Sequence, residues 1–352
     1  MLGRAGGTKQ LVMRGLILLI GASFGILLLS FTIDRFRDNQ VDISEKRVDI
    51  LLSELGEPKG LHFISELDPE KVKKGSELVL SGRTTSPNGK PTKKQSRYFV
   101  CIDCHNVVRE DPVLEDPNPE SRLKYAVEHK IPFLQGTTLF GVVNREHWYN
   151  DDYLKKYGGL VAPARDTLVN AIQLCATTCS QGRLFEDWEL EAVLHYLHSI
   201  GLTVKDLGLN QSEIDKVTDV NSTDKIGKSS LLKQHYSQIS HATFLNPLSQ
   251  SERKYGSNGS VDNGKLVYDN SCLHCHRDGG VTNFVLSHEK VDFSFLKKHL
   301  SGNGNKSVYY ISRKGTYSIN GYKPYMPNYT LERMSHQQLE DLAAYINQQA
   351  SK

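Results

Sequence analysis

The sequence predicts a mostly α-helical protein with two domains in tandem behind a single N-terminal transmembrane helix. Three observations carry this prediction: an uncharged apolar run near the N-terminus, a pair of amphipathic helical patterns that recurs in both halves, and a scarcity of strand-like alternation. A chain of 352 residues is long enough for two domains of ordinary size and their connections. The formal net charge of +3 gives no indication of a nucleic-acid-binding surface, so no nucleic acid partner is expected.

The membrane anchor is predicted over residues 15–33, where the run GLILLIGASFGILLLSFTI carries no formal charge. Such a run is close to the roughly 20 residues that cross a bilayer as a helix. Three basic residues precede it (Arg4, Lys9 and Arg14), and the positive-inside tendency places residues 1–14 in the cytoplasm. The alternative is a cleaved secretory signal, but this run is long and ends in SFTIDRF. Both alternatives export the rest of the chain, and the first makes it a single-pass protein of the inner membrane facing the periplasm or another extracytoplasmic space.

The exported part is predicted to form a spacer, two domains and a linker. Their expected ranges are 34–66 for the spacer, 67–207 for the first domain, 208–258 for the polar linker and 259–352 for the second domain. Within the spacer, residues 41–56 have a helical apolar pattern that ends at Gly56. Within the linker, four apolar or aromatic positions fit a further helix (Leu231, Leu232, His235 and Ile239).

Both domains are expected to begin and end with helices of matching pattern. The segments KGSELVL and NGKLVYDN lie near their beginnings, and LEAVLHYL and LEDLAAYI lie near their ends. Tyr196 and Tyr345 fall at equivalent places in the two terminal helices, and Ser335 with Gln338 predicts a capping box for the last one. Two histidines of the first terminal helix lie off its apolar stripe and are predicted to be exposed (His195 and His198).

Each domain contains one Cys-x-x-Cys-His motif. The first comprises Cys101, Cys104 and His105, and the second comprises Cys272, Cys275 and His276. Two thiols at this spacing can each form a thioether with one vinyl group of the same porphyrin, and the following histidine then becomes the fifth iron ligand. A redox-active dithiol, a disulfide or half of a zinc site is the alternative for one such motif. Two copies at the same point of a repeated domain predict two covalently bound haem c groups. His274, at a variable motif position, is predicted to lie on the surface.

The loop before the last helix, GYKPYMPNYT, contains a candidate sixth ligand for the second iron. It resembles the ligand loop of class I cytochromes c, and the resemblance covers roughly residues 259–350. This resemblance implies a cytochrome c-like domain in which Met326 is that ligand. The other methionine nearby, Met334, is predicted to pack in the core.

The first domain has no methionine, so its iron needs another sixth ligand or stays open. Cys175 and Cys179 lie where a methionine loop is expected. One interpretation is a disulfide, although residues four apart in a helix are near the upper distance limit for one. A second is ligation by one thiolate, with Cys175 preferred and Cys179 next. A third is ligation by a histidine, with His129 and His147 as candidates.

The region from about 70 to 200 resembles the His/Cys haem domain of di-haem thiosulfate dehydrogenases. Their ligand cysteine lies in a stretch of the form Cys-x-x-Arg-Ser-x-Asn-Gly, in which Cys175 takes the cysteine position and Gly182 the glycine position. The sequence VCIDCHN at the first motif adds to the resemblance. The Arg-Ser pair is Thr178–Cys179 here, and the insertion 111–140 has no counterpart. The resemblance therefore implies the domain order and favours Cys175 as ligand, without implying the sulfur chemistry.

Three functions follow from these motifs. The first is a membrane-anchored di-haem cytochrome c that carries electrons to a redox partner protein in a respiratory chain; a thiolate would make its first haem the one of lower potential. The second is an oxidoreductase that acts on a small sulfur anion at the first haem, held by cations such as Arg165, Arg183 or Lys155. The third is a docking subunit of a membrane respiratory complex, with residues 111–157 as the interaction surface. No residue is assigned a catalytic role.

Overall fold

The computed structural model of the protein describes residues 42–352, apart from 283, 287–292, 303, 305 and 317–324. The predicted anchor at 15–33 lies outside the described residues. Within the described ranges, no helix combines the length and the apolar character that a membrane crossing needs. The chain divides into Met1–Glu45 and one larger compact unit, Lys46–Lys352. The described part of this unit holds helices joined by loops and isolated bridges, without an extended strand, which confirms the mostly α prediction.

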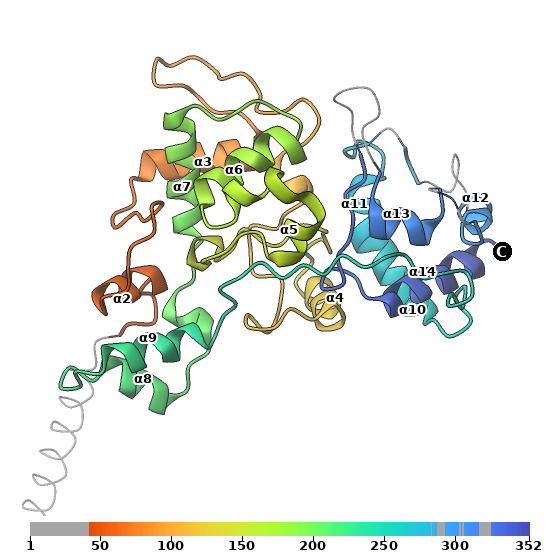
Figure 1. The fold of residues 1–352 in the computed structure, drawn as a ribbon. Helices are drawn as coiled ribbons and strands as arrows, with labels where there is room; N and C mark the ends of the chain where they lie inside the picture. The colour runs from red at the N-terminus through yellow and green to blue at the C-terminus, as the bar shows by residue number, and fades with distance from the viewer. Residues whose placement is uncertain (1–41, 283, 287–292, 303, 305, 317–324) are drawn as a thin grey trace, which may run out of the picture. The chain divides into compact units, whose positions relative to one another are not determined.

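The N-terminal region, residues 67–207, is built mainly on the pair α3 and α7 (Figure 1). Its elements are α3 Pro69–Ser81, η1 Cys101–Asp103, α4 Pro119–Glu128, η2 Val142–Asn144, α5 Asp151–Tyr157, η3 Gly158–Leu160, η4 Ala162–Ala164, α6 Leu168–Leu174, η5 Cys175–Cys179, α7 Asp187–Ser199 and η6 Val204–Leu207. Asp68 caps α3 by accepting from the backbone N–H groups of Glu70 and Lys71, and Gly82 ends it with a φ of 70°. The loop 82–100 that follows leads directly into the first motif.

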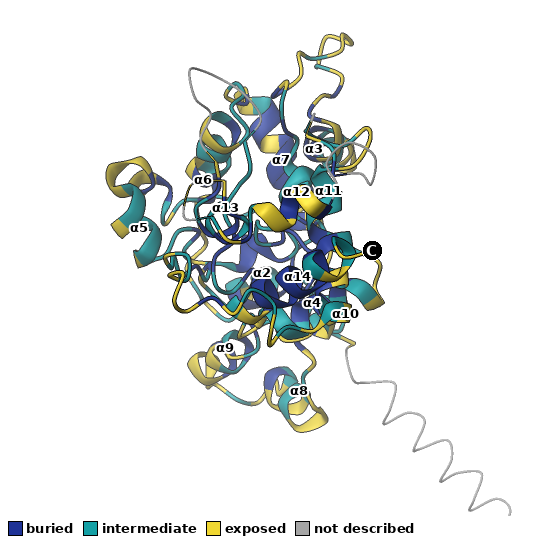
Figure 2. Cartoon of the chain, turned by 90° about the vertical axis from the view of Figure 1, so that its right-hand side faces the viewer, coloured by how far each residue is buried: buried dark blue, intermediate teal, exposed yellow. Residues whose placement is uncertain are grey.

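The C-terminal region, residues 259–352, is built on the pair α10 and α14. Its elements are α10 Val261–Val267, η7 Tyr268–Cys272, α11 Leu273–Cys275, α12 Phe293–Lys298, α13 Val308–Lys314 and α14 His336–Gln349. The predicted capping box of α14 is confirmed, because Ser335 Oγ accepts from Gln338 N at 3.0 Å and Gln338 Oε1 accepts from Ser335 N at 2.9 Å. Figure 2 shows much of α14 and α7 as buried.

The two helix pairs cross at equivalent glycines. A Cβ added at Gly75 of α3 would meet the Ala192 carbonyl oxygen at 2.0 Å, and one added at Gly264 of α10 would meet the Asp341 carbonyl oxygen at 1.9 Å. The Cβ atoms of Tyr196 and Tyr345 lie beside these same two glycines. Since only glycine permits so close an approach of two backbones, the predicted equivalence of the two tyrosines is confirmed.

Helices also form in the predicted spacer and linker. The spacer contains α2, Val48–Glu54, whose apolar face is buried and which is followed by Gly56 with a φ of 98°. The linker contains α8, Gln211–Thr218, and α9, Lys225–Lys233. Helix α9 includes Leu231 and Leu232 as predicted, whereas the helix ends before His235 and Ile239.

The prediction that His195 and His198 are exposed is wrong. Their exposed fractions are 6% and 1%. His198 Nε2 donates to the His62 carbonyl oxygen at 2.8 Å, and its Nδ1 lies 3.0 Å from an oxygen of Asp49. The apolar stripe of α7 identified only the face that packs against α3. The spacer segment covers a second face of α7. This face is polar, so the pattern of apolar residues does not show that it is buried.

Candidate functional site

A cavity of about 460 Å³ lies beside the first Cys-x-x-Cys-His motif. Its walls combine the motif residues with the two remaining cysteines and with many apolar side chains (Cys101, Cys104, His105, Cys175, Cys179, Val79, Leu139, Val142, Leu168, Phe185 and Leu197, among others). Tyr325 and Met326 of the C-terminal region line it as well. An apolar cavity with a few convergent polar groups is typical of a cofactor site.

A backbone carbonyl fixes the orientation of the His105 ring. Its Nδ1 lies 2.6 Å from the Thr137 carbonyl oxygen, which can only accept, so Nδ1 carries the proton and Nε2 is free. Burial lowers the pKa of His105, which favours the neutral imidazole that binds metals. Burial likewise raises the pKa of the Cys101 thiol to about 11. A reactive dithiol has a depressed pKa, so this environment argues against that alternative for the first motif.

The second motif has the same local geometry. His276 Nδ1 lies 2.7 Å from the Phe284 carbonyl oxygen, and the His276 backbone N–H donates to the Cys272 carbonyl oxygen at 3.0 Å. The corresponding backbone bond of the first motif, from His105 to Cys101, is also 3.0 Å. Each motif therefore presents a histidine whose Nε2 carries no proton and has no hydrogen-bond partner among the described residues, next to two cysteines on one turn.

The two motifs contact each other. The His274 ring forms a hydrogen bond with the Ile102 backbone, and it interacts electrostatically with Asp103. The Cys104 and Cys275 thiols lie close enough for their charges to interact. His274 is thus half-buried between the motifs and less exposed than the surface position predicted for it. The sequence carries no signal for this contact, because it joins segments 172 residues apart (274 − 102).

Cys175 and Cys179 begin and end the π-helical turn η5, and both are free thiols facing the cavity. A hydrogen bond between the two side chains raises the pKa of Cys175 and lowers that of Cys179. Cys175 also interacts electrostatically with Cys101 and Cys104. Turns of this kind occur often at functional sites. The structure therefore brings both candidate sulfur ligands to the cavity that holds His105.

The candidate histidine ligands lie elsewhere. His129 stacks on Tyr125, with ring centroids 3.8 Å apart, and His147 Nδ1 pairs with Asp166 at 2.6 Å. Neither is among the described residues that line the cavity. This placement leaves the two cysteines as the stronger candidates for the sixth ligand.

Met326 lies between the cavity and the core of the C-terminal region. Its backbone N–H donates to Thr316 Oγ1 and its carbonyl accepts from Thr316 N, both at 2.8 Å. The preceding residues 317–324 lie outside the described residues, so ligation of the His276 iron by Met326 stays a prediction. Met334 is buried in the core, as predicted.

The cations expected near a sulfur anion are already paired. Arg183 contacts both oxygens of Glu189 at 2.6 Å, Arg165 lies 3.2 Å from Asp151, and Lys155 lies 3.0 Å from Asp152. None of these three is among the described residues lining the cavity.

Two cations that do line the cavity were missed at the sequence level, Arg145 and Lys314. Lys314 Nζ donates to Asn246 Oδ1 at 2.7 Å. Arg145 has one long bond, from Nη2 to the Thr138 carbonyl oxygen at 3.4 Å. Burial lowers the pKa of Arg145 to about 10, so it remains charged at neutral pH. A half-buried cation with such weak partners among the described residues fits an acid group on the cavity's occupant, such as a haem propionate. Its position in the sequence gave no signal of this role.

Comparison with known proteins shows which family the C-terminal region resembles. The family described as Cytochrome C oxidase, cbb3-type, subunit III matches residues 259–346. A cytochrome c6 from Limnospira maxima is 32% identical over 94 residues, which make up 27% of this chain and 98% of that protein. No solved structure matches the chain. The matched region contains the second motif and Met326, and a cytochrome c domain implies a covalently bound haem c, electron transfer and a redox partner protein. Through this C-terminal region, the chain belongs to the cytochrome c family.

Proposed function

We propose that the protein is a membrane-anchored di-haem cytochrome c that carries electrons on the extracytoplasmic side of the membrane. The observation that carries the proposal is the shared geometry of the two motifs. In each, a histidine Nδ1 donates to a loop carbonyl, which leaves Nε2 free beside two cysteines. In addition, α3 packs on α7 and α10 packs on α14 at equivalent glycines, so each motif belongs to a region built on a similar pair of helices.

Each site supplies a complete set of groups for one haem c. In the first, Cys101 and Cys104 would form the thioethers, His105 the fifth ligand and Cys175 the sixth, with Cys179 next in preference. Arg145 would pair with a propionate. In the second, the corresponding residues are Cys272, Cys275, His276 and Met326. When bound, haem supplies one-electron ferric–ferrous chemistry; the chain holds it, sets the iron's ligands and keeps water from it.

The anchor and the location rest on residues 15–33 and on the basic residues before them. An anchored chain would hold its haem domains at the outer face of the inner membrane, within reach of a redox partner. The family match also supports a role as a cytochrome c subunit of a membrane respiratory complex, because its description names an oxidase subunit. The carrier is favoured over an enzyme acting on sulfur anions, because the three predicted anion-binding cations are engaged in ion pairs and Arg145, which does line the cavity, is assigned here to a haem propionate.

The haem content of purified protein tests this proposal. We expect two haem groups per chain by the pyridine haemochrome assay and by the mass of the intact chain. The variant Cys101→Ala/Cys104→Ala should retain one, since it keeps only the second pair of thioether sulfurs. The matched control Cys175→Ala/Cys179→Ala should retain both groups, because those sulfurs form no thioether. A wild-type chain that carries a single haem would contradict the proposal.

The ligand role of Met326 has its own spectroscopic test. A thioether bound to ferric haem gives a near-infrared absorption band, and we expect Met326→His to abolish it. Met334→Leu is the control, because Met334 is buried in the core of the same region and a similar apolar side chain preserves its packing. A band that survives in Met326→His would rule Met326 out as the ligand.

A further inference from the structure

The loop over residues 132–138 supports the histidine of the first motif. Its Thr137 carbonyl oxygen accepts from His105 Nδ1 at 2.6 Å, and its Gly136 N–H donates to the Cys104 carbonyl oxygen at 2.9 Å. The loop also packs directly on the imidazole, because a Cβ at Gly136 would lie 2.7 Å from His105 ring atoms. The orientation of this ring therefore depends on where the loop backbone is held.

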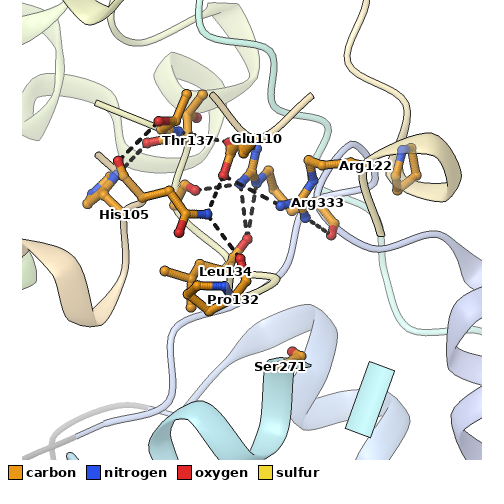
Figure 3. Close-up of polar contacts among 12 residues, drawn as sticks. His105, Glu110, Arg122, Pro132, Leu134, Thr137, Ser271 and Arg333 are labelled. Atoms are coloured by element: carbon orange, nitrogen blue, oxygen red, sulfur yellow. Dashed lines mark hydrogen bonds and ion pairs between the residues drawn. The ribbon is translucent and has the colours of Figure 1, made fainter. Parts of the chain in front are cut away.

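A side chain from the C-terminal region holds that backbone. Arg333 is buried, and its Nη2 donates to the carbonyl oxygens of Leu134 at 3.1 Å and Gly136 at 2.6 Å (Figure 3). Its Nη1 lies 2.7 Å from Glu110 Oε1, and the same oxygen accepts from the Thr138 backbone N–H at 2.9 Å. The residues on both sides of Thr137 are thus fixed by one guanidinium–carboxylate pair.

The geometry points to Arg333 as a positioning residue for His105: a side chain of the C-terminal region sets the orientation and basicity of the ligand in the first site. This inference rests on the proposed function, because it concerns His105 as an iron ligand. The hydrogen bond from Nδ1 of a ligating histidine increases the electron donation of Nε2 to the metal. Arg333 acts through the loop, without lining the cavity itself among the described residues.

The chemistry of arginine suits this role better than that of lysine. A planar guanidinium presents several N–H donors in a fixed fork, so it can serve two carbonyls and a carboxylate at once. A lysine at this position keeps the positive charge but has a single ammonium centre. Arg333→Lys therefore separates the loss of geometry from the loss of charge.

The test is a redox titration of the holoprotein in which each centre is followed by its electron paramagnetic resonance signal. We expect Arg333→Lys to raise the midpoint potential of the first centre and to change its signal, while the second centre keeps its wild-type values. The midpoint potential should rise because weaker electron donation from His105 to the iron stabilises the ferric state less. The matched control is Arg313→Lys, which alters a buried arginine whose bonds to Tyr329 and Thr330 stay within the C-terminal region. It should leave the first centre unchanged.

A first centre with unaltered potential and signal in Arg333→Lys would overturn the inference, even if the variant were less stable. If Arg333→Lys does not fold, Gly136→Ala tests the same support, because its Cβ would displace the loop from His105. An unchanged first centre in that variant would again overturn the inference. Haem content is measured first: a single haem per chain would overturn the proposed function and this inference together. Two haems with an unchanged first centre would overturn this inference alone.

Discussion

Replacing Cys175 with alanine is expected to remove the thiolate-type low-spin signal of the haem proposed at the first motif. It should also raise the midpoint potential of that haem by on the order of 0.1 V or more, within the roughly 0.8 V over which axial ligands set haem potentials. A thiolate donates charge to the iron and stabilises the ferric state, so its loss favours reduction. Electron paramagnetic resonance at low temperature and a redox titration measure the two effects.

Cys179→Ala is the matched variant, because Cys179 lines the same cavity and hydrogen-bonds to Cys175. With Cys175 as ligand, Cys179→Ala keeps a thiolate signal. A signal that persists in Cys175→Ala and disappears in Cys179→Ala would assign the iron to Cys179 instead. The hydrogen bond between the two sulfurs makes this comparison necessary, because it favours the thiolate at Cys179, while both sulfurs interact electrostatically with Cys104 of the motif.

Local patterns predicted the helices well. The capping box at Ser335 and the apolar stripes of α7 and α14 depend on residues three or four apart, which one sequence displays directly. The equivalence of Tyr196 and Tyr345 followed from the same patterns. The prediction failed for His198, because its partners Asp49 and His62 lie more than a hundred residues away and belong to a segment whose packing no local pattern encodes.

The same distinction separates the parts of the site. Each Cys-x-x-Cys-His motif lies within five consecutive residues, so the sequence alone displays it. Arg145, Arg333 and the contact of His274 with Ile102 became visible only when the fold brought distant segments together. The prediction that Arg183 binds an anion failed for a related reason. Its ion pair with Glu189 depends on how the chain enters α7, and a sequence does not show whether a charged residue has a partner nearby.

Glu110 is the centre of a buried charge network that links the two regions. Its side chain is 3% exposed and lies 2.7 Å from Arg333 and 3.7 Å from Arg122, and Asn106 Nδ2 donates to it at 2.8 Å. Arg122 also donates to the Arg333 carbonyl oxygen, and its guanidinium stacks 3.9 Å from the centre of the Phe133 ring. One carboxylate therefore neutralises part of the charge of two buried guanidiniums.

We expect Glu110→Gln to lower the free energy of unfolding by about 3–5 kcal/mol, the usual effect of removing one partner from a buried ion pair. Glutamine keeps the shape but leaves two buried guanidiniums without a counter-charge. Urea denaturation of the holoprotein measures the change. The matched control is Glu191→Gln, which breaks the exposed pair of Glu191 with Lys71, 2.6 Å apart, and should change the free energy of unfolding far less because water screens this pair. Equal effects of the two variants would contradict a structural role for the network.

The dependence of the free energy of unfolding on acid pH tests whether the charge of Glu110 causes this stabilisation. Burial alone would raise its pKa, but the charges of Arg333 and Arg122, with hydrogen bonds from Arg333 and Asn106, lower it to about 2 from 4.5. A carboxyl whose folded pKa is lowered contributes stability above its unfolded pKa and loses it as pH falls. This contribution, about 3 kcal/mol, should therefore disappear between pH 4.5 and pH 2 in the wild type and be absent in Glu110→Gln.

Arg122 acts on stability in the opposite direction. Burial and the charge of Arg333 lower its pKa to about 9, so keeping it charged in the folded protein is unfavourable below that pH. The network as a whole therefore adds less to stability than the pKa of Glu110 alone suggests, and its main effect is to fix the loop at Thr137. The arginine does not titrate in acid, so the difference between wild type and Glu110→Gln below pH 4.5 reports Glu110 together with its electrostatic coupling to Asp111. If the free energy of unfolding falls equally with decreasing pH in the two proteins, the charge of Glu110 does not stabilise the fold.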